Sequence, residues 1–259
     1  MNYMPIIAAI ALLTAPCRSF SPAQVLPLLQ VRAPRQQELT VAISISTSIS
    51  TSSTKLHSLK PAALPLMDAG KALARSGELL IDATSTPKLD IYGGGLSSAG
   101  ANLRNAGDCL AQAAASCRFK TASELVCDEM REAATCLIEA VVHLKKAADD
   151  AEVDELLAMK GCIENDMIPY MQKSGEILEL AGAGIMKREK LDDIGKYFVA
   201  AGAEMGQLAL GIQKIDGELE ETKVSGQRML YASQKMREAG NNLMGVKPEQ
   251  KKGKSWLKG

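Results

Sequence analysis

Large and small apolar residues alternate in one heptad pattern that occurs six times between residues 66 and 243. Each copy places two small residues three and four positions after a large apolar residue, and the next large residue at position seven. One copy begins at Leu96, continues through Ala99-Gly100 and ends at Leu110. These offsets share one face of an α-helix, because successive residues lie about 100° apart around its axis. The large positions are Leu66, Leu73, Leu80, Leu96, Leu103, Leu110, Met130, Leu137, Leu144, Met171, Leu178, Ile185, Phe198, Met205, Ile212, Met229, Met236 and Leu243.

The repeat predicts an all-α body between residues 61 and 245. Pro169 is expected to kink or divide the fourth helix, with 153–166 before it and 169–184 after it. Two architectures remain open, a six-helix bundle and a stack of antiparallel helical hairpins built on the repeated small-residue heptads. The other helices are expected at 64–83, 96–117, 121–148, 189–215 and 218–244.

Glycine shares the helix faces with leucine, although each helical glycine costs about 1 kcal/mol relative to alanine. Close packing of neighbouring helices offsets this cost, because a missing side chain lets two backbones approach. The alternative is that the small residues make room for a flat or elongated ligand, such as a pigment or a lipid. The run Gly93–Gly95 matches no phosphate-binding loop and is interpreted as a flexible hinge. The glycines assigned to the helix-packing seam are Gly70, Gly77, Gly100, Gly107, Gly175, Gly182, Gly202 and Gly240.

The first 60 residues differ in composition from the helical body. The apolar run 5–15 has the length of a signal-peptide core, and small residues precede Phe20 at the expected cleavage site. We therefore assign 1–19 to a signal peptide. Residues 20–60 contain one acidic residue, Glu38, and many Ser and Thr residues, which is typical of a disordered transit peptide.

The order of a signal peptide and then a transit peptide resembles the bipartite presequence of algae with secondary plastids, such as diatoms. Their junction motif is A-S-A-F-A-P, and the corresponding run here is Cys-Arg-Ser-Phe-Ser-Pro at 17–22. Phe20 and Pro22 match this motif, whereas Cys17 and Arg18 differ from it. The resemblance covers the presequence alone and implies a plastid location, in the stroma or at the stromal face of the thylakoid. The alternative is a secreted protein with a Ser/Thr-rich stalk.

Charge is distributed unevenly along the chain. The body 61–245 holds 28 acidic and 20 basic residues, a net charge of −8, which argues against nucleic acid as a partner. The tail 246–259 has a net charge of +4 and the only tryptophan. It is either a solvated chain end or a peptide that docks on a partner or a membrane surface. The docking residues would be Lys251, Lys252, Lys254, Trp256, Leu257 and Lys258.

Residues with catalytic or metal-binding potential are few. The cysteines after the presequence form no C-x-x-C pair, so no zinc site of familiar spacing is present. Cys109 and Cys127 are about equally far from the turn expected near Phe119. They are candidates for a disulfide bridge, and the alternative is free thiols in a reducing compartment. His143 is the single histidine of the body and has no partner motif.

These features favour a non-enzymatic plastid protein without a cofactor. We expect a structural or interaction role, as a helical scaffold or accessory subunit of a larger photosynthetic or carbon-fixing assembly. A peripheral contact with the thylakoid is part of this expectation. The alternatives are a helical module that binds lipid or pigment, and a secreted helical bundle.

Overall fold

A computed structural model describes residues 58–86, 94–119, 123–151, 157–215 and 219–246. All of them belong to one unit of the chain, Thr51–Gly259. The predicted signal peptide, the predicted transit peptide up to residue 57 and the tail from residue 247 lie outside the described residues. The described part is almost entirely helical and contains no strand, which confirms the all-α prediction.

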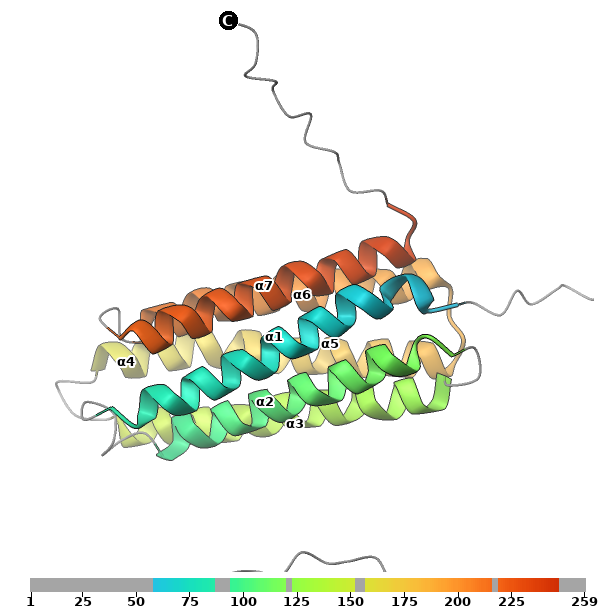
Figure 1. Ribbon diagram of the computed structural model, residues 1–259. Helices are drawn as coiled ribbons and strands as arrows, with labels where there is room; N and C mark the ends of the chain where they lie inside the picture. Colours follow the sequence, from blue (N-terminus) through green and yellow to red (C-terminus); the bar gives the residue numbers. More distant parts are fainter. Residues whose placement is uncertain (1–57, 87–93, 120–122, 152–156, 216–218, 247–259) are drawn as a thin grey trace, which may run out of the picture. The chain divides into compact units, whose positions relative to one another are not determined.

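The described residues form six long helical rods that run side by side (Figure 1). The fourth rod consists of three consecutive segments. None of the described helices combines the length and the apolar character that crossing a bilayer requires. The elements are α1 (Lys60–Thr84), α2 (Gly94–Ser116), α3 (Ser123–Asp150), α4 (Leu157–Cys162), the π-helical segment η2 (Ile163–Met167), α5 (Ile168–Met186), α6 (Leu191–Lys214) and α7 (Glu220–Leu243).

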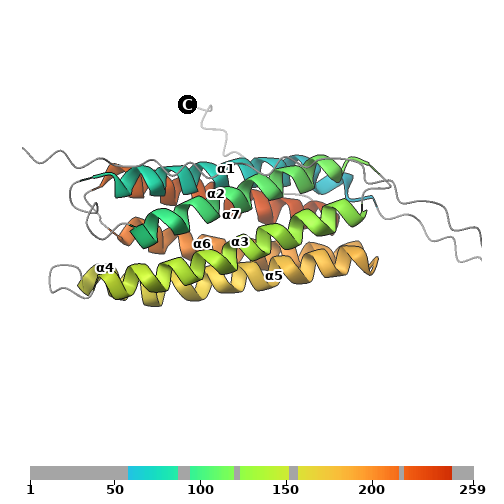
Figure 2. The same cartoon turned by 90° about the horizontal axis from the view of Figure 1, so that it is seen from below.

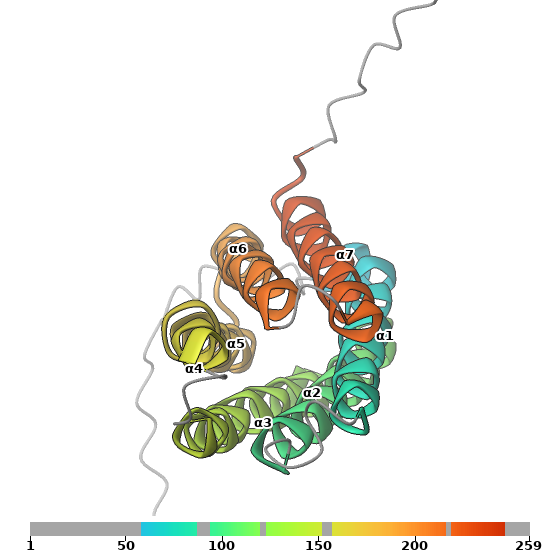
Figure 3. The same ribbon diagram turned by 90° about the vertical axis from the view of Figure 1, so that its left-hand side faces the viewer.

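The rods form a closed ring. Each one packs against the rods before and after it in the chain, and α1 also packs against α7. Neighbouring rods are antiparallel, as where Gly195 near the start of α6 meets Gly240 near the end of α7. Figure 3 shows the ring end-on, and Figure 2 shows the rods lengthwise. Of the two predicted architectures, the closed six-helix bundle is therefore the one observed.

Large side chains fill the centre of the ring. All 18 large positions of the repeat are buried, and the most accessible of them, Leu243, exposes only 5% of its surface. Phe198 is the bulkiest of the fully buried side chains. Burial of one such side chain contributes about 1.5–3 kcal/mol, which offsets the cost of about 1 kcal/mol for a helical glycine.

The start of α1 depends on a contact with α7. This helix begins at Lys60, four residues before the predicted start, with Pro61 in its first turn where a missing N–H is tolerated. Pro65 cannot donate the hydrogen bond that the carbonyl of Pro61 would normally accept. Asn242 of α7 donates from Nδ2 to that carbonyl at 3.2 Å instead. A donor from a distant part of the chain thus lets the helix continue through two prolines.

The interruption predicted at Pro169 takes the form of η2, which ends just before the proline. Pro169 has no N–H for the carbonyl of Asn165, and its ring would clash with that carbonyl in a regular α-helix. The wider π turn relieves this clash, and the N–H of Ile168 donates five residues back to the carbonyl of Ile163. The side chain of Asn165 donates to the carbonyl of Gly161 at 2.8 Å.

The beginning of α2 corrects the interpretation of the glycine run as a hinge. Gly94 and Gly95 are helical, and Gly93 lies outside the described residues. Gly95 is buried, and a Cβ built on it would lie 2.7 Å from the backbone N of Ala147 in α3. The glycine is therefore required for close approach of two helices, which the local sequence did not indicate.

Two helices end with a residue in the left-handed region. Gly245 follows α7 with φ 69°, and the next N–H donates to the carbonyl of Asn241 at 2.9 Å, as in a Schellman motif. Arg188 holds the equivalent position after α5 with φ 56°, and the next N–H donates to the carbonyl of Gly184 at 2.9 Å. A non-glycine residue in this conformation costs about 1–2 kcal/mol.

Candidate functional site

The glycines of α1 and α2 lie where the two backbones come closest. A Cβ on Gly70 would lie 2.6 Å from the backbone N of Ala111, and one on Gly77 would lie 2.5 Å from the backbone N of Arg104. Such distances exclude any side chain at these positions without a shift of the helices. Gly100 and Gly107 complete the same interface from the α2 side.

The remaining seam glycines lie at other interfaces of the ring. Gly175 and Gly182 face α3, and Gly202 and Gly240 join α6 to α7. A Cβ on Gly202 would lie 2.8 Å from the carbonyl oxygen of Ser233, whose hydroxyl donates to the carbonyl of Gly202 at 2.6 Å. Because neighbouring helices occupy this space, a flat ligand has no room between the helices at these glycines.

The five cysteines between Cys109 and Cys162 are free thiols. The structure does not pair Cys109 with Cys127. The thiol hydrogen-bonded to Cys109 is that of Cys136. Cys127 lies on the part of α3 that packs against α5, and its carbonyl faces Gly182. Equal distance from a turn places two residues at one level of an antiparallel pair, but it does not place them on facing sides of the two helices.

Cys109 of α2 meets two carboxylates of α3 at the edge of their interface. Its Sγ and one carboxylate oxygen each of Glu129 and Glu132 all lie within 4.8 Å of one another. Cys109 is buried, Glu129 is half-buried and Glu132 is exposed, so the cluster is open to solvent on one side. Burial and then the charge of Glu132 raise the pKa of the Cys109 thiol to about 12. The same two causes raise the pKa of the Glu129 carboxyl.

Sequence reasoning missed this cluster. Glu129, Glu132 and Cys136 are spaced as i, i+3 and i+7, so they line one stripe of α3. That spacing was the available signal, but it does not show which stripe faces Cys109. The cluster is created by the antiparallel packing of α2 on α3.

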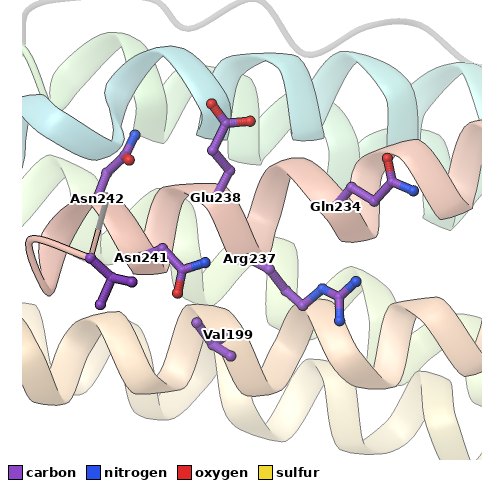
Figure 4. Close-up of a pocket in the computed structure, with 7 residues that line it drawn as sticks. Val199, Gln234, Arg237, Glu238, Asn241 and Asn242 are labelled. Carbon is purple, nitrogen blue, oxygen red and sulfur yellow. The ribbon is translucent and has the colours of Figure 1, made fainter. Parts of the chain in front are cut away.

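An open depression of about 470 Å³ lies on the outer side of α7 (Figure 4). Arg237 and Asn241 point toward α6 there, whereas Glu238 points toward α1. The Glu238 carboxylate accepts a hydrogen bond of 2.7 Å from the Lys235 ammonium. The described residues that line the depression include no histidine, thiol or second carboxylate, so they form no pair of nucleophile and base.

Six of the seven buried Ser and Thr side chains in the described helices donate hydrogen bonds to backbone carbonyls. Ser174 donates to the carbonyl of Tyr170 at 2.8 Å, and Ser76 donates to that of Ser225 at 3.0 Å. Every buried side-chain nitrogen or oxygen in the described part of the chain has a hydrogen-bond partner. His143 is half-buried on α3 and is the only histidine among the described residues. No serine–histidine pair of the catalytic kind is therefore assembled within these ranges.

One end of the bundle gathers exposed apolar side chains. Phe119, between α2 and α3, exposes 68% of its surface, and Leu125 in α3 exposes 51%. Met186 ends α5 at the same level, because Gly182, one turn earlier, packs against the beginning of α3. Since the rods alternate in direction, the start of α1 and the end of α7 also lie here. We call this the Phe119 end, and its exposed apolar residues are Leu64, Phe119, Leu125, Met186 and Val246.

Charged groups of both signs accompany these side chains. Arg118, Lys187 and Arg188 are exposed at the Phe119 end, and so are Glu124 and Asp192. At the other end, the exposed large apolar residues in the ranges that the structure describes are Leu157 and Leu210. The predicted docking residues Lys251, Lys252, Lys254, Trp256, Leu257 and Lys258 lie outside the described residues, in the tail that follows Val246.

Comparison of the chain with protein-family models, curated proteins and solved structures found no match. The class of the protein is therefore defined by its own geometry. It is a closed antiparallel six-helix bundle with a filled centre, small residues at the helix contacts, and one end at which several large apolar side chains are exposed.

Proposed function

We propose that this chain is a non-enzymatic plastid scaffold or accessory subunit that docks through its Phe119 end on an acidic face of a larger protein assembly. The observation that carries the proposal is the gathering of exposed apolar side chains at one end, beside Arg118, Lys187 and Arg188. Apolar patches with a polar rim are typical of interaction sites. The lysines of the tail, which follows Val246 in the sequence and has a net charge of +4, would steer such a surface toward an acidic partner.

The interior supports an interaction role over the lipid- or pigment-binding alternative. Large side chains fill the ring, and backbone atoms occupy the space beside the seam glycines such as Gly70 and Gly202. A bound pigment or lipid would require at least two helices to separate. Recognition is therefore expected on the outer surface, and we propose that the tail with Trp256, which follows Val246 in the sequence, takes part in it.

The plastid address is supported by the resemblance of residues 1–60 to a bipartite presequence. The proposed location is the stroma or the stromal face of the thylakoid, and the proposed partners are photosynthetic or carbon-fixing assemblies there. A secreted helical bundle is the alternative address.

Purification of the native protein from its source cells tests this proposal. The N-terminal residue, the cell fraction and the co-purifying proteins would be identified together, and an absorption spectrum recorded. We expect a mature start near residues 50–62, a plastid fraction, a larger complex and no visible absorption from the bundle itself. A start at Phe20 in a secreted fraction with no partner would contradict the function and the address. A pigment that stays with the isolated chain would favour the ligand-binding alternative.

A further inference from the structure

The cluster of Cys109, Glu129 and Glu132 has the composition and the access of a metal site. One sulfur and two carboxylate oxygens from two helices lie within 4.8 Å of one another. The buried thiol forms the inner side, and the exposed Glu132 leaves a path from solvent. The thiol of Cys136 is hydrogen-bonded to that of Cys109 and lies one turn beyond Glu132 on the same stripe of α3.

The surroundings of the cluster are negatively charged. Asp108 precedes Cys109 on α2, and both glutamates lie on the facing helix. Nearby arginines are directed elsewhere, since Arg104 pairs with Glu78 of α1 at 3.5 Å and the side chain of Arg131 lies against Gly182 of α5. Among the described residues, no lysine or arginine forms an ion pair with Glu129 or Glu132. A cation between the carboxylates would relieve their mutual repulsion.

We propose that Cys109, Glu129 and Glu132 bind one thiophilic divalent cation of the zinc and cadmium class. Carboxylates alone would suit Mg²⁺ or Ca²⁺, but a sulfur ligand favours softer ions. Zn²⁺ bonds of about 2.0–2.3 Å bring tetrahedral ligand atoms to roughly 3.5 Å from one another. Rotation of the two glutamate side chains closes the remaining gap without movement of either helix. On binding, the sulfur–metal bond forms as the thiol proton of Cys109 leaves to solvent.

The test is a titration of the reduced full chain with Cd²⁺, in the presence of a phosphine reductant that keeps the thiols free. The thiolate-to-cadmium charge-transfer absorption in the ultraviolet reports a sulfur ligand directly. We expect saturation at one Cd²⁺ per chain and a rise in melting temperature with Cd²⁺ concentration. Cys109→Ser should abolish the absorption band. Glu132→Gln, at an exposed position that leaves folding intact, should weaken Cd²⁺ binding by more than about tenfold.

Two control variants separate the site from general metal binding. Cys127→Ser and Glu124→Gln remove a thiol and a carboxylate from the same helix but outside the cluster, and both should bind Cd²⁺ as the wild type does. Mg²⁺ at equal concentration should not compete. The proposal is overturned if the wild type shows no charge-transfer band, if Cys109→Ser and Glu132→Gln both retain wild-type binding, or if Mg²⁺ displaces Cd²⁺.

Discussion

Ser76 and Ser225 hydrogen-bond each other's backbone across the contact that closes the ring. The Ser225 hydroxyl donates to the carbonyl of Ser76 at 2.8 Å, and the Ser76 hydroxyl lies 3.0 Å from the carbonyl of Ser225. Both residues are buried, and they are 149 positions apart in the sequence. A serine at each position is small enough for α1 and α7 to approach closely. The hydroxyl of each serine is hydrogen-bonded there to the backbone carbonyl of the other.

Removal of either hydroxyl should weaken this closure. We expect Ser76→Ala and Ser225→Ala each to lower the free energy of unfolding by about 1 kcal/mol, because one buried hydrogen bond is lost. The double variant should cost less than the sum, with a coupling of about 0.5–1 kcal/mol in a denaturant-based double-mutant cycle. Ser98→Ala is the control, since that hydroxyl bonds only the carbonyl of Gly94 in its own helix. Additive single effects would show that the two serines do not act as a pair.

A methyl group at a seam glycine should destabilise the bundle even though alanine favours a helix. Gly70→Ala places a Cβ 2.6 Å from the backbone of α2, and we expect it to lower the free energy of unfolding by about 2 kcal/mol or more. Gly161→Ala is the matched control, because the nearest atom to its Cβ is 4.0 Å away. That variant should gain about 0.5–1 kcal/mol. Equal effects in urea unfolding would contradict the close-packing account.

The end of α5 offers a stabilising substitution. Arg188 has φ 56°, a conformation that glycine adopts without steric cost. We expect Arg188→Gly to raise the free energy of unfolding by about 1 kcal/mol. Lys187→Gly, at the preceding position with φ −73°, should instead lower it. A loss of stability in Arg188→Gly would show that the arginine side chain contributes more than its backbone conformation costs.

Burial of Cys117 predicts a loss of stability in alkaline solution. Burial raises the pKa of this thiol from 9.0 to about 12, so the folded state holds the proton more tightly than the unfolded state. The stability that this provides is complete below pH 9 and declines as the pH rises toward 12. Relative to Cys117→Ala, reduced wild type should lose up to about 1.4 kcal/mol per pH unit in this window. Parallel stability profiles for the two proteins would contradict the prediction.

The repeat was sufficient to predict the six helices and their buried faces, because burial of Leu103 or Met236 depends on a period that is visible locally. Pro169 likewise identified the interruption in the fourth rod, since its missing N–H acts within one helix. Closure of the ring was not predictable in this way. The pattern shows which side of a helix is buried, but it does not show which other helix covers that side. For α1 and α7 this became visible only in the folded bundle, where Ser76 and Ser225 meet.

The same limit applies to the candidate sites. The sequence correctly placed Cys109 on the helix that packs against α3. Its neighbours, however, depend on how α3 is rotated about its own axis, and that rotation brings Glu132 and Cys136 to Cys109 rather than Cys127. Gly95 was interpreted as part of a hinge because its contact with Ala147 exists only in the folded bundle. The Phe119 end was missed because its members come from five separate segments of the chain.

The most direct test of the docking proposal compares exposed apolar residues at the end and on the side of the bundle. Phe119→Ser with Leu125→Ser alters the Phe119 end, whereas Val142→Ser with Leu180→Ser alters the side, at positions of similar exposure. Each double variant would replace the native protein in its source cells, and the size of its native complex would be measured. Our account predicts that the end variant is released from the complex as a folded monomer while the side variant stays bound. Retention of the end variant, or release of the side variant alone, would contradict it.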